Sequence, residues 1–140
     1  MLIICNGMKR AGSTLQYNLI SDIITSRHNV LKHGYLELDD QKITLDLLFK
    51  YSEDENFHII KTHDIISDKM KDKLKNYKIL YVYRDLRDVA LSLINKGVSE
   101  DHIINILEKE VEKYYKILDS NNVIISRYED LYEDISSEIL

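Results

Sequence analysis

A short apolar run followed by two closely spaced glycines constrains the fold of this chain more than any other feature. Residues 2–5 are too few for a helix and are typical of a buried strand. Gly7 and Gly12 enclose the next turn, and they are two of only four glycines in a chain that has no proline. Over residues 14–27 apolar side chains recur at helical spacing, which predicts a helix with a wide apolar face. The opening unit is therefore a strand, a glycine loop and a helix that packs on a sheet.

The rest of the sequence continues to alternate short apolar runs with helical patterns. We expect strands at residues 57–61, 78–83 and 123–126, and helices at residues 42–51, 65–77, 86–94, 99–118 and 128–140. Residues 28–40 have weak periodicity and are assigned no element. In the helix at 99–118 the expected apolar row is Ile103, Leu107, Val111, Tyr114 and Leu118. The alternation predicts an α/β fold, three-layer α/β/α with a central parallel sheet, whose ligands bind at the carboxyl ends of the strands.

Composition and charge limit the partners and the compartment. With 140 residues, 44% of them hydrophobic, the chain fits a single globular domain over residues 1–140. Its net charge of -5 gives no general attraction to nucleic acid or to an anionic membrane, so we expect neither as a partner. No apolar run is long enough to span a bilayer, and no secretory signal is visible. The single cysteine, Cys5, excludes an internal disulfide and multi-cysteine zinc patterns, and it favours the reducing cytoplasm.

The glycine loop is nearly a phosphate-binding loop. Two glycines with four residues between them precede Ser13 and Thr14 at a helix start, where backbone N–H groups and the helix dipole attract an anion. The lysine that usually follows the second glycine is absent, but Lys9 and Arg10 supply positive charge upstream. The alternative is an ordinary turn between a strand and a helix, with two exposed cations.

Lys61 ends the strand at residues 57–61, and His63 lies two residues later. Residues two apart in extended backbone project to the same face, so a cation would lie beside a titratable base. Such a histidine can remove a hydroxyl proton, while the lysine keeps the imidazole neutral and stabilises negative charge on a leaving oxygen. The alternative is a surface lysine and histidine in a loop.

Arg84 and Ser92 form a third candidate site after the strand at residues 78–83. Ser92 shares a polar helix row with Asp85 and Asp88, so its hydroxyl and the Arg84 guanidinium could chelate one phosphate. The alternative is an arginine paired with Asp85 or Asp88 and a solvated serine. Tyr128, after the last strand, either packs on a base or covers the edge of the sheet.

Taken together, the four segments resemble the sulfotransferases that use 3′-phosphoadenosine 5′-phosphosulfate (PAPS). Residues 10–15 are similar to the family's loop for the 5′-phosphosulfate, and residues 61–63 match the family's Lys-Thr-His motif. Residues 81–92 are similar to the family's 3′-phosphate segment, and residues 128–131 resemble the family's Tyr-Glu-Asp segment. The order and approximate spacing agree over residues 3–131. The resemblance implies a single P-loop-like domain that transfers a sulfuryl group from PAPS to a hydroxyl or amine acceptor and releases 3′-phosphoadenosine 5′-phosphate (PAP), without a metal.

The resemblance also implies roles for individual residues. His63 would be the general base, with Lys61 and Arg10 contacting the transferring group. The expected nucleotide-binding residues, from the loop to the last strand, are Lys9, Arg10, Ala11, Gly12, Ser13, Thr14, Arg84, Ser92 and Tyr128.

The sequence departs from the family pattern in three places. Arg10 replaces the loop lysine, Leu15 replaces a tryptophan, and nothing matches the late Arg-Lys-Gly loop of cytosolic members. Without that loop we expect weaker nucleotide binding and a site open to water, unless a second protomer of a homodimer covers it. Two alternatives stay open: a nucleotide kinase or other P-loop NTPase, in which Asp85 and a loop hydroxyl hold magnesium, and a non-catalytic remnant.

Overall fold

The computed structural model describes residues 1–39 and 41–133, which form five strands and six helices. The strands are β1 (Leu2–Gly7), β2 (Val30–Tyr35), β3 (Phe57–Lys61), β4 (Tyr77–Tyr83) and β5 (Val123–Arg127). The helices are α1 (Ser13–Thr25), α2 (Lys42–Glu53), α3 (Asp68–Lys73), α4 (Leu86–Ile94), α5 (Glu100–Leu118) and α6 (Tyr128–Glu133).

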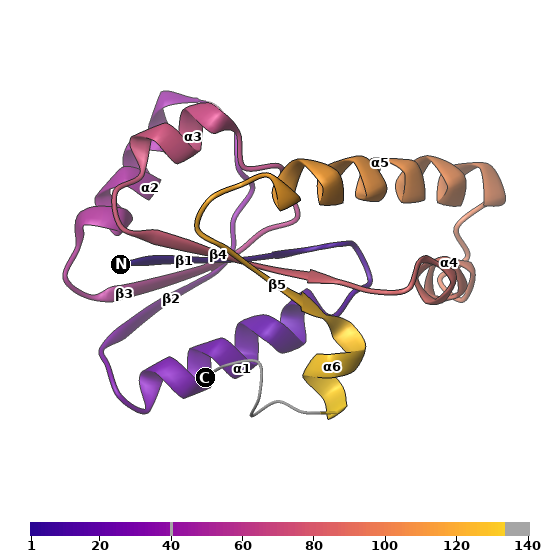
Figure 1. The fold of residues 1–140 in the computed structure, drawn as a ribbon, viewed down its shortest axis with the longest axis horizontal. Coiled ribbons are helices and arrows are strands. Elements are labelled where there is room, and N and C mark those ends of the chain that lie inside the picture. The colour runs from indigo at the N-terminus through magenta and orange to yellow at the C-terminus, as the bar shows by residue number, and fades with distance from the viewer. Residues whose placement is uncertain (40, 134–140) are drawn as a thin grey trace.

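All strand pairs in the sheet are parallel, in the order β2-β3-β1-β4-β5. Helices α2, α3 and α5 lie on one side of the sheet, and α1 and α6 lie on the other (Figure 1). The predicted three-layer α/β/α architecture with a central parallel sheet is therefore confirmed. Strand β1 occupies the centre and is buried along its whole length. The loop that follows β1 consequently lies between the carboxyl ends of β3 and β4, where ligands bind in such sheets.

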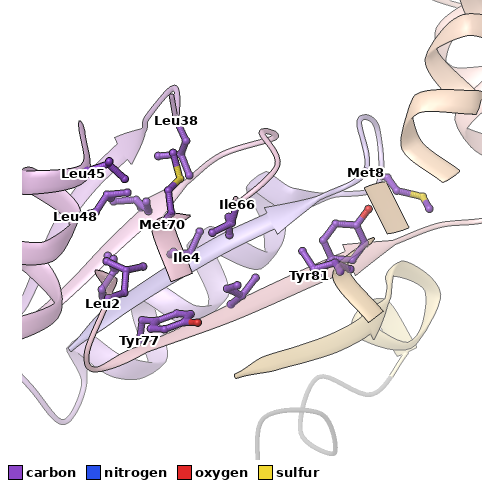
Figure 2. Packing of buried hydrophobic residues seen from close by; sticks show 14 of the residues in the cluster. Leu2, Ile4, Met8, Leu38, Leu45, Leu48, Ile66, Met70, Tyr77 and Tyr81 are labelled. Carbon is purple, nitrogen blue, oxygen red and sulfur yellow. The ribbon is translucent and has the colours of Figure 1, made fainter. Parts of the chain in front are cut away.

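Alternate side chains of β1 supply the two halves of the core, because successive residues of a strand face opposite sides of the sheet. Leu2 and Ile4 pack with Leu48 and Met70 on the side of α2 and α3 (Figure 2). On the other side Ile3, Cys5 and Ile59 pack against apolar residues of α1. Burial raises the pKa of the Cys5 thiol to about 12, so Cys5 acts as a small apolar side chain.

One strand was not predicted, and one helix was predicted too long. Residues 30–35, for which the sequence predicts no element, form the edge strand β2, whose mostly exposed residues lack the apolar signature of a central strand. The helix expected at residues 65–77 is shortened to Asp68–Lys73, because Ile66 and Leu74 reach the core from the extended segments on either side. Residues 134–140 of the last predicted helix lie outside the described residues.

The buried face of α5 also differs from the predicted apolar row. Its most buried side chains are Ile103, Glu110, Lys113 and Ile117, whereas Leu118 is 44% exposed. Helix α5 runs across the carboxyl-end loops of the sheet (Figure 1), and these loops present backbone carbonyls that an apolar side chain could not satisfy. None of the helices within residues 1–39 and 41–133 is long and apolar enough to cross a membrane.

Candidate functional site

The loop between β1 and α1 adopts a tight left-handed path. Arg10 has φ 65° and Gly12 has φ 80°, values that non-glycine residues rarely adopt. The backbone N–H of Met8 donates to the Val82 carbonyl at 2.9 Å, and the buried side chains of Met8 and Ala11 anchor the loop in the core. These anchors leave Arg10 exposed at the tip of the loop, above the start of α1.

Lys61 extends from the end of β3 toward the start of α1. Its Nζ donates to Thr14 Oγ1 at 2.6 Å. The register of the parallel pair sets this placement, since Cys5 of β1 lies opposite Lys61 and the loop begins just beyond. The contact brings a cation to the first turn of α1, where N–H groups have no partner within the helix.

The His63 ring is fixed on both sides by the same loop. Its Nδ1 lies 3.0 Å from the Gly7 carbonyl oxygen, and its Nε2 lies 3.4 Å from Ser13 Oγ. Because a carbonyl only accepts hydrogen bonds, Nδ1 carries the hydrogen and Nε2 presents its lone pair. The pKa of His63 is lowered, chiefly by burial and further by the cations of Lys113 and Lys61, although the Gly7 hydrogen bond opposes the shift. The imidazole is therefore neutral near pH 7 and can accept a proton at Nε2.

Arg84 leaves the end of β4 and stacks over the Tyr128 ring, with its guanidinium carbon 4.4 Å from the ring centroid. Its Nη2 lies 3.4 Å from an Asp88 oxygen, so the predicted pairing with an acidic neighbour is present. Its buried Nε makes no hydrogen bond within the described part of the chain and lies 4.0 Å from Glu129 Oε1. Nearby, Arg10 Nε donates to Ser92 Oγ at 2.9 Å. The Arg84 Nε–H could therefore donate to a ligand oxygen.

These side chains line one cavity of about 470 Å³, a size that suits a nucleotide-sized ligand. Four cations face it, Lys9, Arg10, Lys61 and Arg84, and no carboxylate is among its lining residues in the described ranges. The remaining lining residues are Gly12, Ser13, Thr14, His63, Ser92, Leu93 and Tyr128. The positive charge of these side chains favours an anionic ligand over a cationic one.

The structure brings every predicted site residue to this cavity except Ala11. The Ala11 side chain is fully buried in the core, and its backbone N–H donates to the Met8 carbonyl at 3.2 Å. Within residues 1–39 and 41–133, no group of three or more histidine, cysteine, aspartate or glutamate side chains could hold a metal ion.

Sequence reasoning missed two side chains behind the cavity, Glu110 and Lys113 of α5. Their spacing of three residues is the same as that of an exposed helical ion pair, and nothing in one sequence separates the two cases. It also missed Tyr35, which is 56% exposed and has its ring centroid 6.1 Å from that of His63. Tyr35 became recognisable only once β2 was placed beside β3.

Comparisons with known proteins bear on the family and the fold of this chain. A family model described as the sulfotransferase domain matches residues 2–140. A search of curated proteins found no match.

Solved structures resemble the fold at low sequence identity. The mouse sulfotransferase SULT7A1 complexed with PAP has a TM-score of 0.62 at 17% identity, covering 98% of this chain and 55% of that one. The Bacillus subtilis YorR protein, in complex with phosphorylated GDP, has a TM-score of 0.61 at 15% identity, covering 96% of this chain and 93% of that one. Retinol dehydratase in a complex with retinol and PAP has a TM-score of 0.54 at 18% identity, with coverages of 96% and 56%. The chain thus spans about half the length of the mouse sulfotransferase and of retinol dehydratase.

Proposed function

Because this chain belongs to the sulfotransferase domain family, we propose that it transfers a sulfuryl group from PAPS to an acceptor hydroxyl or amine. One observation supports the proposal: Arg10, Lys61, His63, Arg84 and Ser92, from three separate segments of the chain, line a single cationic cavity. An adenosine bearing a 5′-phosphosulfate and a 3′-phosphate has two anionic ends, which match the two ends of this cation set.

The 5′ end of the donor would bind at the loop and the first turn of α1. The N–H groups of this turn point out of the helix, and Ser13 and Thr14 add hydroxyl donors beside them. The Lys61 ammonium, whose Nζ lies 2.6 Å from Thr14 Oγ1, would also donate to the oxygen that joins the sulfur to the 5′-phosphate. Arg10 would face the same anion from the opposite side of the cavity. When PAPS gives up its sulfuryl group, the 5′-phosphate of PAP is the leaving group. These donors would stabilise the negative charge that develops on that phosphate.

His63 would act as the general base. The acceptor proton moves to Nε2 while the acceptor oxygen or nitrogen forms its bond to sulfur, and the bond from sulfur to the phosphate oxygen breaks. The Nδ1 hydrogen bond to Gly7 keeps the ring oriented throughout. The exposed ring of Tyr35 beside His63 offers the acceptor a flat apolar surface.

The 3′-phosphate would bind between Arg84 and Ser92. Arg84 Nε is a buried donor that makes no hydrogen bond within the described residues, 4.0 Å from Glu129 Oε1, and the 3.4 Å contact of Nη2 with Asp88 is long enough to be exchanged for a phosphate oxygen. Tyr128 would hold the guanidinium in place by stacking and would border the adenosine.

A nucleotide kinase or other P-loop NTPase is the second candidate, because the similar YorR structure holds a phosphorylated GDP. The surroundings of Asp85 argue against it. Arg87 Nε and Nη2 donate to both Asp85 oxygens, at 3.0 and 2.6 Å, and these bonds hold the pKa of Asp85 well below its usual range. A carboxylate occupied in this way is a poor magnesium ligand. The third candidate, a non-catalytic remnant, predicts stable folding without affinity for adenosine phosphates.

Titration calorimetry distinguishes the three candidates. We would titrate the chain with PAP, with ADP, with ATP plus magnesium, and with the guanosine analogue of PAP, and repeat each titration on Arg84→Ala. Arg87→Ala is the matched control, because Arg87 lies three positions from Arg84, in the first turn of α4, and does not line the cavity. PAP binding that exceeds ADP binding and weakens only in Arg84→Ala supports the proposal, and transfer of labelled sulfate from PAPS to a panel of acceptors completes the test. Tighter binding of magnesium ATP indicates an NTPase, and no binding by the folded chain indicates a remnant.

A further inference from the structure

A buried ion pair lies directly behind the cavity. The side chains of Lys113 and Glu110, on α5, are 6% and 5% exposed, and their Nζ and Oε2 atoms are 2.5 Å apart. Burying two charges is costly, and an apolar pair of similar size often stabilises a fold as well or better. The position of this pair therefore calls for an explanation other than stability.

The Lys113 ammonium is surrounded by three acceptors. Its Nζ donates to the Gly7 carbonyl and to the His63 carbonyl, each at 3.1 Å, and it forms the ion pair with Glu110. A protonated lysine can donate to both carbonyls and also carries the positive charge of the ion pair, whereas a neutral amine would carry no charge to pair with Glu110. Burial lowers the pKa of Lys113, and the neighbouring Glu110 carboxylate opposes that shift. Glu110 thus helps Lys113 to keep its proton in this buried position.

Both carbonyls held by Lys113 belong to the machinery around His63. The Gly7 carbonyl also accepts the Nδ1 hydrogen of His63 at 3.0 Å, so one oxygen joins the ammonium to the imidazole. The second carbonyl is that of His63 itself. Lys113 therefore joins the loop after β1 to the segment after β3 by hydrogen bonds, beside the His63 ring.

We infer that Lys113 is a positioning residue for His63: by holding the Gly7 and His63 carbonyls it keeps the hydrogen on Nδ1 and the lone pair of Nε2 directed into the cavity. Glu110 completes the device by neutralising the buried ammonium. The catalytic consequence rests on the proposed function, but the effect on the histidine does not.

The charges around His63 make the inference testable. Lys61 at the end of β3 and Lys113 on α5 both lower the pKa of His63, whereas Glu110 on α5 raises it. The loop after β1 contributes the Gly7 carbonyl and the uncharged Ser13, and β2 contributes the uncharged Tyr35 ring. Removing the lysine charge should therefore raise the pKa of His63, and removing the glutamate charge should lower it.

The experiment is an NMR titration of the histidine rings in the full chain, with His63→Gln used to assign the His63 signals. The variants are Lys113→Met, Glu110→Gln and the double variant. The double variant has no unpaired buried charge, so it serves as the test if either single variant fails to fold. Lys116→Met, an exposed lysine on the same helix, is the matched control. We expect the His63 pKa to change in opposite directions in the two single variants and to stay the same in Lys116→Met. The ¹⁵N chemical shifts of the His63 ring should show a pure Nδ1–H tautomer in the wild type and a mixture of tautomers in Lys113→Met. An unchanged His63 pKa and tautomer in every folded variant would overturn the inference.

A kinetic arm separates this inference from the proposed function. In Lys113→Met, kcat for transfer from PAPS should fall at least about tenfold, with the KM for PAPS close to that of the wild type. If wild-type chain shows no transfer and no PAP binding while the variants shift His63 as expected, the proposed function fails and the positioning role stands. If transfer proceeds in the wild type and Lys113→Met retains both its kcat and its His63 tautomer, the positioning role fails and the proposed function stands.

Discussion

Arg10 Nε donates a hydrogen bond to Ser92 Oγ at 2.9 Å, although the two residues are 82 positions apart in the chain. The bond joins the loop after β1 to helix α4, and it links the proposed subsites for the two phosphate ends of the nucleotide. Arg10 uses the Ser92 oxygen as an acceptor, so the Ser92 O–H is still able to donate to a bound 3′-phosphate. Ser92 would then contact the guanidinium and the phosphate at the same time.

Ser92→Ala should weaken PAP binding about tenfold, because a hydrogen bond to a charged phosphate is lost. ADP lacks the 3′-phosphate, and its affinity should stay nearly unchanged. Calorimetry with both ligands measures the difference. Equal losses for PAP and ADP would show that Ser92 acts on the loop through Arg10 rather than on the 3′-phosphate.

The rate of sulfuryl transfer should depend on pH through His63. The base works only when its ring is neutral, and its folded-state pKa lies below the ordinary value of about 6.5. The kcat/KM for the acceptor should therefore be flat above about pH 6.5 and should fall as the pH drops below the lowered pKa.

His63→Ala should lower kcat by about 10²- to 10⁴-fold and should abolish this acid limb. Its PAP affinity should remain within a few-fold of wild type, since other residues supply the cations. A variant that retains full transfer with every acceptor tried would remove the general-base assignment.

Gly12→Ala should destabilise the fold and abolish nucleotide binding together. At φ 80° a side chain costs about 1–2 kcal/mol, and the new Cβ would also overlap the Tyr128 ring. Gly97→Ala is the matched control, because Gly97 has φ 77° but open space around it. Urea unfolding should show the larger loss in Gly12→Ala, and only that variant should lose PAP binding. Similar behaviour of the two variants would mean that backbone strain alone matters.

The stability of the fold should fall below about pH 6.5 because of His33 as well as His63. The His33 ring stacks on Tyr51, and its Nε2 lies 2.9 Å from His58 Nδ1. Burial, and then the charge of His58, lower the pKa of His33. The unfolded chain therefore binds more protons than the folded chain as the pH falls from the unfolded pKa to the folded one, and stability declines over that window.

Urea unfolding at pH 7.5 and pH 5.5 measures this decline. His33→Gln should show a smaller difference between the two pH values than the wild type does. An equal difference in both proteins would assign the pH dependence to His63 and the carboxylates alone.

The sequence predicted which residues would lie together better than it predicted the edges of the fold. The residues after each strand indicated this grouping, because parallel strands bring their carboxyl ends to one edge of the sheet. His63 and Arg84 were placed by that rule, and the structure brings both to one cavity. Strand β2 carries no such signal, since an edge strand buries little and its pattern resembles a loop.

Lys113 could not be found from the sequence for a different reason. A charged residue on an amphipathic helix is normally solvated, and Lys113 is not part of the apolar row predicted for this helix. The side chain is buried because two carbonyls of distant loops need a donor at that point. That need arises from the tertiary arrangement, and no local pattern in α5 reports it.

The central place of β1 sets the order in which this protein can fold. Leu2 pairs with His58 on one side and with Tyr77 on the other, 56 and 75 positions away in the sequence. Until both neighbouring strands have been synthesised, the apolar residues of β1 cannot be buried in the sheet and are exposed to other chains. Contacts of such long sequence separation also slow folding. The loop after β1 contacts Val82 and Ser92, so we expect nucleotide affinity to appear only after β4 has paired with β1.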